Sequence, residues 1–388
     1  MVKSNIPEIR FPGFSGDWKK RRLAEVAHYR NGGSFENEVV NKGKYELITL
    51  KSVDINGNLV PSKKFIDSEV STLAKDTLVM ILSEQAPGLL GKTSVIPFNN
   101  YYVLNQRVAS LTPKEESDSN FLTKAINRNG KYFSSRGAGT KVQNISKPNV
   151  ENFEFFIPEL KEQIKIGSFL KMVDNIIYLH QQELNTLKQT KQGFLQKMFP
   201  KEGESFPEVR FDGFSGEWSR VTLDKVIQKQ IKGKAQLGKF SDGEVEYLDA
   251  NRLNGGAPFY SNGIQDVSAD NIIILWDGSK AGTVYKGFCG VLGSTLKAYS
   301  INEKNNSDFI YQQLVHNQEK IYKHYRTPNI PHVVKDFTDV FLIYITSLEE
   351  QQKIGDFLKQ LDDTIALHQR ELDILKETKK AFLQKMFV

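Results

Sequence analysis

The sequence has 388 residues, of which 39% are hydrophobic, 25% charged and 11% aromatic. That length predicts two or three domains with enough apolar residues for real cores. No run of about 18 apolar residues is present, which argues against a membrane-spanning helix, and the first ten residues lack the apolar core of a secretory signal. The single cysteine, Cys289, excludes an internal disulfide and a cysteine-based zinc module. We therefore expect a cytoplasmic protein.

The formal net charge is +6, and the excess lies mainly in residues 1–159, with 22 basic and 17 acidic side chains. Residues 119–150 hold six basic side chains and no acidic one. Weaker basic windows cover 278–302 and 309–335. Such windows attract polyanions, although each one taken alone is also compatible with an ordinary solvated surface.

The chain begins with a short leader, residues 6–18, that returns as residues 206–218 with nine of thirteen positions identical. Residues 160–199 return as 348–387 with 26 of 40 identical, whereas the sequence between the repeated segments mostly differs. In each half, repeated segments flank an interior region whose sequence has diverged. This pattern indicates that both halves perform the same kind of function, each on its own target.

Both interiors have a mixed α/β pattern. In the first, the predicted helix is Asp118–Phe133 and the predicted strands are Tyr45–Leu50, Leu78–Leu82, Ser94–Phe98, Tyr102–Leu111 and Glu154–Ile157. In the second, the predicted helix is Ser307–Tyr325 and the predicted strands are Glu246–Leu248, Ile272–Trp276, Val284–Phe288, Leu296–Ile301 and Val340–Ile345.

The repeated tails have alternating steps of three and four between their seam positions, which predicts coiled-coil helices. The seam positions of the first tail are Ile166, Leu170, Val173, Ile177, His180, Leu184 and Leu187. Those of the second tail are Ile354, Leu358, Leu361, Ile365, His368, Leu372 and Leu375. Because the first helix delivers the chain to the second interior, the second helix has to return along it. We expect an antiparallel pair with His180 close to His368, as polar seam residues that set the register and bind no metal.

The sequence thus predicts an α+β fold, in which two mixed α/β domains are separated by an antiparallel two-helix coiled coil with pseudo-two-fold symmetry. The expected divisions are 1–159, 160–200, 201–347 and 348–388. The aromatic leader should dock on the equivalent end of the second helix, Phe382–Phe387, because residues 206–218 directly follow the first helix and should pack near Phe194–Phe199. The chain ends would then lie close together.

Several segments resemble catalytic motifs, but the predicted structure around each one does not fit the motif. Residues 86–93 resemble a phosphate loop, but a β-like segment follows where a helix N-terminus is needed. Glu377-Thr-Lys379 has a nuclease spacing but lies on a predicted helix, and its repeat partner is Gln189-Thr-Lys191. The six histidines have no metal-binding spacing, and no hydrolase, dinucleotide-binding or adenine-methylase motif is present. The sequence therefore predicts a non-catalytic chain.

The layout resembles the specificity subunit of type I restriction-modification enzymes. The resemblance rests on Leu160-Lys-Glu-Gln-Ile-Lys-Ile-Gly-Ser-Phe-Leu170, on its repeat Leu348–Leu358, and on the loop Gly137-Ala-Gly-Thr-Lys-Val-Gln-Asn-Ile145. It covers the whole chain. The second half departs in the corresponding loop, Arg326–His332, which lacks the glycines.

The resemblance implies that each interior is a target-recognition domain for one half of a split double-stranded DNA site, with the coiled coil setting the gap. It also implies two methyltransferase subunits that modify adenine N6 and carry S-adenosylmethionine. Restriction-translocase subunits using ATP and Mg²⁺ would complete the complex. The chain itself would bind no cofactor.

DNA recognition needs donors to phosphates and to base edges. The candidates are Lys92, Arg107, Arg136, Thr140, Lys141, Gln143, Asn144, Lys280, Lys297, Tyr325, Arg326, Asn329 and His332. Arg107 and Lys297 are expected at similar places on corresponding strands. Two alternatives remain open at this point: a tandem DNA-binding scaffold or regulator without a methyltransferase partner, and a phosphate-loop enzyme using Lys92 and Thr93.

Overall fold

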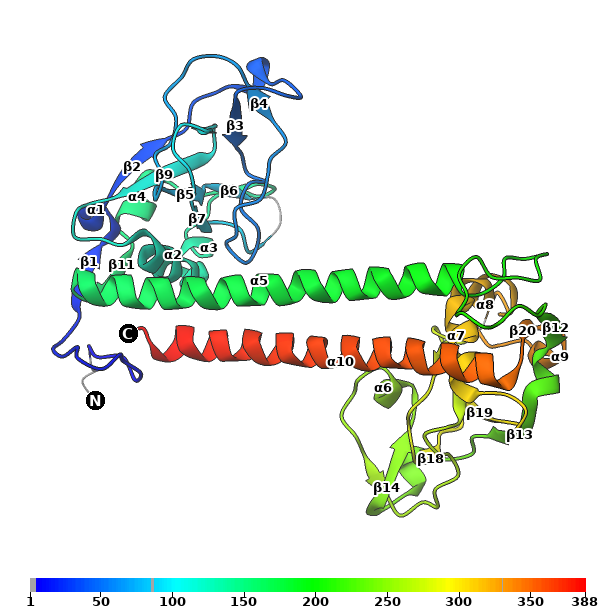
Figure 1. Ribbon diagram of the computed structural model, residues 1–388. Coiled ribbons are helices and arrows are strands. Elements are labelled where there is room, and N and C mark those ends of the chain that lie inside the picture. Colours follow the sequence, from blue (N-terminus) through cyan, green and yellow to red (C-terminus); the bar gives the residue numbers. More distant parts are fainter. Residues whose placement is uncertain (1–4, 85–86, 330) are drawn as a thin grey trace. The chain divides into compact units, whose positions relative to one another are not determined.

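The computed structural model describes residues 5–84, 87–329 and 331–388 (Figure 1). The chain divides into two compact units. Unit 1 contains Met1–Gln181 with Glu371–Val388, and unit 2 contains Gln182–Arg370. Each unit therefore holds one α/β domain and a part of both long helices.

Unit 1 is built on a four-stranded sheet in the order β2-β9-β5-β7, a three-stranded sheet in the order β4-β3-β8, and the pairs β1-β11 and β6-β10. The strands are β1 (Lys19–Arg22), β2 (Ala27–Asn31), β3 (Tyr45–Ile48), β4 (Phe65–Ile66), β5 (Leu78–Ile81), β6 (Ser83–Glu84), β7 (Thr93–Val95), β8 (Tyr102–Leu104), β9 (Val108–Pro113), β10 (Gln143–Asn144) and β11 (Glu154–Ile157).

Unit 2 repeats this topology with different residues. Its sheets have the orders β13-β19-β16-β17, β15-β14-β18 and β12-β20. The strands are β12 (Ser219–Thr222), β13 (Ile227–Lys232), β14 (Asp242–Leu248), β15 (Tyr260–Ser261), β16 (Ile272–Leu275), β17 (Val284–Tyr285), β18 (Val291–Leu292), β19 (Leu296–Ile301) and β20 (Leu342–Ile345).

Short helices connect and cover these sheets, and two long helices follow them. The α-helices are α1 (Leu23–Val26), α2 (Ser119–Asn127), α3 (Gly130–Ser134), α4 (Lys147–Glu151), α5 (Leu160–Lys197), α6 (Ala250–Leu253), α7 (Ser307–His316), α8 (Gln318–His324), α9 (Phe337–Val340) and α10 (Leu348–Lys385). Short 3₁₀ turns form η1 (Glu36–Glu38), η2 (Leu223–Val226) and η3 (Leu237–Lys239). Within the described residues, no helix combines the length and the apolar character needed to cross a membrane.

Each predicted strand overlaps an observed one, but their sheet partners β1, β2, β12 and β13 were not predicted. The single strand predicted over Tyr102–Leu111 is β8 and β9, separated by a turn in which Arg107 has a φ of 63°. Each predicted interior helix is two helices, broken near Arg128 in unit 1 and at Asn317 in unit 2. At each break an asparagine amide donates to the carbonyl four residues earlier, Asn129 to Ala125 at 2.8 Å and Asn317 to Gln313 at 2.9 Å. Apolar periodicity does not reveal such a cap.

The long helices pair antiparallel within each unit. In unit 1, Phe169 of α5 packs edge-on against Phe382 of α10, with ring centroids 5.0 Å apart. In unit 2, Phe194 of α5 packs in the same way against Phe357 of α10, at 4.9 Å. Low residue numbers of one helix thus meet high numbers of the other, which confirms the predicted direction.

The predicted seam positions lie at these helix contacts or between them. Half of them are buried: Ile166, Leu170, Val173 and Leu184 on α5, and Ile354, Leu358 and Leu372 on α10. Ile177, Leu187, Leu361, Ile365 and Leu375 are half-buried. His180 belongs to unit 1 and His368 to unit 2, so the closeness of the two imidazoles stays a prediction.

Each leader segment joins both helices of its own unit. In unit 1, the Ile9 N–H donates to the Lys385 carbonyl at 2.9 Å, and Trp18 packs edge-on against Phe387 at 6.1 Å. The Arg10 guanidinium forms a bidentate pair with Glu162 at the start of α5, with both N···O distances 2.7 Å. The predicted docking of the leader on the end of the second helix is confirmed.

Unit 2 contains the same clamp. The Val209 N–H donates to the Lys197 carbonyl at 2.9 Å, and Trp218 packs against Phe199 at 6.1 Å. Arg210 pairs with Glu350 at 2.6 and 2.7 Å. The repeated sequence therefore encodes one repeated tertiary contact, in which a fully buried carboxylate is neutralised by an arginine of the leader.

Candidate nucleic-acid interface

A polar hairpin covers residues 138–144 in the domain of unit 1, and its second strand pairs with β6. Its backbone closes between Ala138 and Asn144, with reciprocal N–H···O bonds of 2.9 Å. At Gly139 the φ is 129°, and an added Cβ would lie 2.0 Å from the Val142 carbonyl oxygen. Only glycine fits this turn without strain. The hairpin exposes the predicted residues Thr140, Lys141, Gln143 and Asn144.

An arginine stacked on a tyrosine stands where this hairpin begins. The Arg136 guanidinium lies 3.7 Å from the centroid of the Tyr132 ring and donates to the Tyr132 carbonyl at 3.2 Å. Stacking holds the planar cation in place while it stays exposed. Arg136 therefore presents a fixed positive charge beside the hairpin.

Arg107 is connected to the same hairpin through Leu82, the residue that follows the inner strand β5. The Leu82 N–H donates to the Arg107 carbonyl at 3.1 Å, and the Leu82 carbonyl accepts from the Ile145 N–H at 2.9 Å. The Arg107 side chain is exposed and lines a cavity of about 350 Å³ with Gln106, Lys51 and Lys64. The Lys64 ammonium and the Asn105 amide hydrogen-bond to Glu36 and lower the pKa of that carboxyl.

Unit 2 forms the same hairpin without the glycines. The Thr327 N–H donates to the His332 carbonyl at 3.0 Å, and Thr327 Oγ1 lies 3.1 Å from His332 Nδ1. His332 pairs with Asp277, and the Val333 N–H donates to the Trp276 carbonyl at 2.9 Å. A threonine–histidine closure thus replaces the glycine turn. The tip includes the exposed Asn329, while residue 330 lies outside the described residues.

The arginine–tyrosine stack is also repeated. Arg326 lies 4.7 Å from the centroid of the Tyr322 ring, four residues earlier, as Arg136 follows Tyr132. Arg326 also donates to the Ser279 and Ala281 carbonyls at 3.2 and 3.4 Å. These bonds bring the loop that carries the exposed Lys280 beside the hairpin.

Two predicted residues of unit 2 are more enclosed than an open DNA-binding side chain. Tyr325 packs edge-on against Phe337 and Phe341, with ring centroids 5.5 and 5.2 Å apart. Lys297 is half-buried with its ammonium 3.2 Å from the Trp276 ring centroid. Desolvation, together with the nearby Lys232, lowers the pKa of Lys297.

The expectation that Arg107 and Lys297 occupy similar places is wrong by two residues. Leu82 and Trp276 are equivalent, since each accepts from the residue after its hairpin, Ile145 or Val333. The Leu82 N–H donates to Arg107, whereas the Trp276 N–H donates to the Thr295 carbonyl at 2.8 Å. Thr295 is therefore the counterpart of Arg107, and Lys297 pairs with Ile274 as Ala109 pairs with Met80.

Gln106, Ser294 and Thr295 were missed by the sequence analysis. Asn105-Gln-Arg107 interrupts an otherwise apolar run, Tyr102–Leu104 and Val108–Leu111. That polar interruption indicates an exposed turn, but the prediction of one strand over Tyr102–Leu111 included it. In unit 2 the signal is Gly293-Ser-Thr295.

Comparison with known proteins supplies a family. The model of the type I restriction modification DNA specificity domain matches residues 15–189 and again residues 215–377. The chain belongs to this family. The two matches fall on the two halves of the internal repeat.

Two relatives and one solved structure agree with this assignment. The specificity subunit of the type I restriction enzyme MjaVIII from Methanocaldococcus jannaschii is 28% identical over 192 residues, and the chain spans about half of that subunit, 45%. The putative MjaX specificity subunit of the same organism is 22% identical over 98% of this chain and 95% of its own length. The crystal structure of the type I S subunit from M. genitalium has the same fold, with a TM-score of 0.76 and 18% identity over 99% of both chains.

The phosphate-loop alternative disagrees with the local geometry of this specificity-family chain. Thr93 lies in β7, which pairs with β5 as a hairpin. Asn127 binds the Thr93 N–H and hydroxyl at 2.8 and 3.0 Å, and its carbonyl accepts from Lys92 Nζ at 3.3 Å. Burial and the nearby Lys379 lower the pKa of Lys92. A strand follows where a phosphate loop needs a helix N-terminus, and Ala86, the first residue of the motif, lies outside the described residues.

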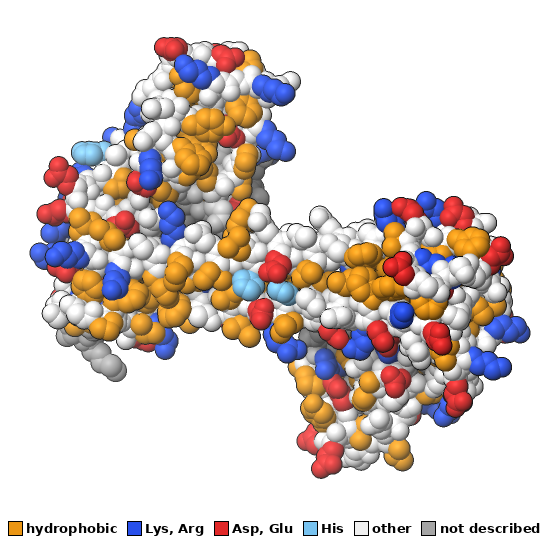
Figure 2. All heavy atoms as spheres, viewed as in Figure 1, with side chains coloured by type: hydrophobic (Ala, Val, Ile, Leu, Met, Phe, Trp, Pro, Cys, Tyr) orange, Lys and Arg blue, Asp and Glu red, His pale blue; other side chains and the backbone are white. Residues whose placement is uncertain are grey.

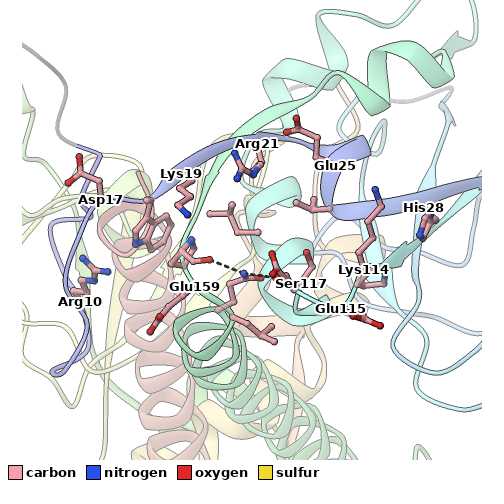
Figure 3. A pocket seen from close by; sticks show the side chains of 18 of the residues that line it. Arg10, Asp17, Lys19, Arg21, Glu25, His28, Lys114, Glu115, Ser117 and Glu159 are labelled. Carbon is pink, nitrogen blue, oxygen red and sulfur yellow. Dashed lines mark hydrogen bonds between the residues drawn. The ribbon is translucent and has the colours of Figure 1, made fainter.

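A larger cavity of about 1220 Å³ lies where the leader meets β1 and α5 (Figure 3). Its labelled side chains carry both signs of charge: Lys19, Arg21 and Lys114 face the same space as Asp17, Glu25 and Glu159. A polyanion would meet carboxylates there. The hairpins of this specificity-family chain are therefore the better candidates for DNA contact.

Proposed function

We propose that this chain is the DNA-reading subunit of a type I restriction-modification complex. Each α/β domain recognises one half of a split double-stranded site, and the helix pair sets the distance between the halves. Residues 1–159 and 201–347 act as the two readers, and residues 160–200 and 348–388 act as the ruler.

The observation that carries this proposal is the repeated hairpin. Both domains place an arginine–tyrosine stack and a polar hairpin beyond the carboxyl end of the equivalent sheet strand, β5 or β16. The side chains on the two hairpins differ, with Lys141 and Gln143 on one and Asn329 and His332 on the other. Two domains that recognise different half-sites need the same backbone framework with different side chains on the hairpins. Base edges are distinguished by the donors and acceptors presented to them.

The chemistry of the complex belongs to its partners. Two methyltransferase subunits carry S-adenosylmethionine and dock on the repeated helices, and translocase subunits use ATP and Mg²⁺ on the same DNA in the cytoplasm. The chain alone binds DNA weakly through salt-sensitive phosphate contacts and transfers no methyl group. Isolation of a methyltransferase with this chain separates the proposal from the alternative of a DNA-binding scaffold that works without one.

The test is a domain exchange read by methylome sequencing. Residues 219–345 are replaced by the corresponding segment of another specificity subunit, in a cell that contains the partner subunits. We expect one half of the methylated sequence to change and the other half to stay. A change in both halves, or methylation that does not depend on the chain, would contradict independent readers.

A further inference from the structure

The repeated helices differ most along one exposed stripe. In α5 the stripe has Lys161, Ile164, Ser168, Met172, Asn175 and Leu179, and in α10 the matching positions hold Glu349, Gln352, Asp356, Gln360, Asp363 and Leu367. Steps of three and four place each set on one helix face, and every one of these side chains is exposed. The stripe is cationic and apolar in α5 but acidic and polar in α10.

In unit 1 this stripe and the leader enclose a shallow groove of about 450 Å³. Ile164 and Met172, which are 46% and 52% exposed, form its floor with Phe11 and Phe169. The Phe11 ring packs edge-on against Phe169 at 5.7 Å. Figure 2 shows hydrophobic side chains gathered over the helices of unit 1.

Lysines line the edge of the groove. Lys161 and Lys165 both border it, and the Lys165 ammonium lies 5.6 Å from the centroid of the Phe11 ring. The stripe itself has no carboxylate. An apolar floor beside two ammonium groups is complementary to an amphipathic helix whose apolar residues are flanked by acidic ones.

Unit 2 has the same pair of aromatic rings, but the exposed stripe beside it has different residues. Phe211 packs against Phe357 at 5.8 Å, as Phe11 packs against Phe169. Glutamines replace the isoleucine and the methionine, and three carboxylates stand on the stripe. One of them, Asp363, is paired with Lys359 at 2.5 Å. An acidic amphipathic helix would meet repulsion here and would have to desolvate amide groups.

We propose that the groove of unit 1 binds an acidic amphipathic helix of the methyltransferase partner and that unit 2 binds the same helix more weakly. The two copies of the partner then bind in two unequal steps, the first at unit 1. This inference rests on the proposed function, because that function supplies the partner and its two copies. The internal duplication makes the difference testable, since each unit supplies the residues that should convert the other.

The experiment titrates the full chain with the methyltransferase subunit purified from the native complex, using isothermal calorimetry and native mass spectrometry. Two exchange variants are compared with the unaltered chain: Ile164→Gln with Met172→Gln, and Gln352→Ile with Gln360→Met. All four positions are exposed, and each new residue already occurs at the repeated position. Thermal unfolding followed by circular dichroism checks that both variants keep the fold.

For the unaltered chain we expect two dissociation constants that differ by about tenfold or more, as expected when apolar anchors are present at only one site. The first variant should lose the tighter step, and the second should tighten the weaker step. Lys161→Glu, which introduces the charge of unit 2, should weaken the tighter step by a smaller factor.

Three results would overturn the inference. Equal constants for the two sites of the unaltered chain would do so, as would unequal constants that neither exchange alters. The third is weakening of both steps by one exchange, which would place the partner across both units. Failure of every chain, including the unaltered one, to bind the methyltransferase would instead contradict the proposed function.

Discussion

The two α/β domains have one topology and two surfaces, and the difference lies at the ends of the strands. Both four-stranded sheets follow the same strand order, and both bring glycine into close backbone contact at the same place. The turn beside that place is Asn105-Gln-Arg107 in one domain and Gly293-Ser-Thr295 in the other. Strand pairing therefore constrains the sheet residues, while the turns and hairpins at the strand ends are open to change.

The largest expected effect concerns the clamp between leader and helix. Arg10→Met leaves the fully buried Glu162 carboxylate without its bidentate partner, and removing one partner of a buried pair costs about 3–5 kcal/mol. Arg210→Met should cost less, because Thr346 Oγ1 still donates to Glu350 at 2.5 Å. Chemical denaturation measures both changes in the free energy of unfolding.

Limited proteolysis sharpens this comparison. Arg10 also donates to the Gly16 and Ser15 carbonyls of its own leader, at 2.7 and 3.1 Å, whereas residues 206–218 lie between α5 and β12. Arg10→Met should therefore expose its leader to cleavage more than Arg210→Met does. Equal protection of the two segments would show that the ion pair does not hold the leader in place.

The next effect tests whether the two sheets are constrained alike. A Cβ on Gly32 would lie 1.8 Å from the Asn105 carbonyl oxygen, and a Cβ on Gly233 would lie 1.9 Å from that of Gly293. Gly32→Ala and Gly233→Ala should each force strands apart and cost about 1–3 kcal/mol or more. Thermal unfolding should show similar losses for both variants, and a loss in only one domain would break the equivalence of the sheets.

The long helices and the leader contacts could be predicted from the sequence because short-range patterns encode them and each pattern occurs twice. The three-four steps of α5 and α10 gave the helices, and connectivity gave their direction. The docking of residues 6–18 on the end of α10 could be predicted because Phe382–Phe387 repeats the sequence of Phe194–Phe199. In each of these cases, residues near in sequence, or repeated in it, determine the contact.

The site was less predictable because its contacts join residues far apart in the chain. The hairpin of unit 2 lacks the glycines of residues 137–139, and its closure by Thr327 and His332 has no sequence signature. The counterpart of Arg107 was misassigned because Leu82 and Trp276 define the register, and that register depends on hydrogen bonds between distant strands. Loop residues that bind a target carry no apolar periodicity.

The third prediction exchanges the turn residues of the two readers. Arg107→Thr should weaken recognition of the half-site read by the first domain by about 1–3 kcal/mol, the usual value of a bidentate base contact. The half-site read by the second domain should keep its specificity. Methylome sequencing shows which positions become degenerate, and Thr295→Arg is the reciprocal variant. Degeneracy in the second half-site after Arg107→Thr would contradict the assignment of Arg107 to recognition of the first half-site.

The smallest expected effect compares the side chains that cover the ends of the long helices. In unit 1 the Arg128 guanidinium lies 5.1 Å from the centroid of Phe387. In unit 2 the His316 ring stacks on Phe199, with centroids 6.0 Å apart and planes inclined by 26°. Arginine stays charged at every ordinary pH, whereas burial against the core lowers the pKa of His316 from its usual 6.5.

The direction of the pH dependence follows from that shift. Below pH 6.5 the unfolded chain protonates His316 before the folded chain does, so the stability of unit 2 should fall as the pH decreases from about 6.5 toward the lower folded pKa. The loss should be modest because part of the imidazole stays exposed to water. Denaturation curves at pH 7.5 and at pH 5.5, about one unit either side of the ordinary histidine pKa, measure it. His316→Gln should remove this contribution, and Arg128→Gln should leave the difference between the two pH values unchanged. An unaltered difference in the His316 variant would assign the acid sensitivity to other groups.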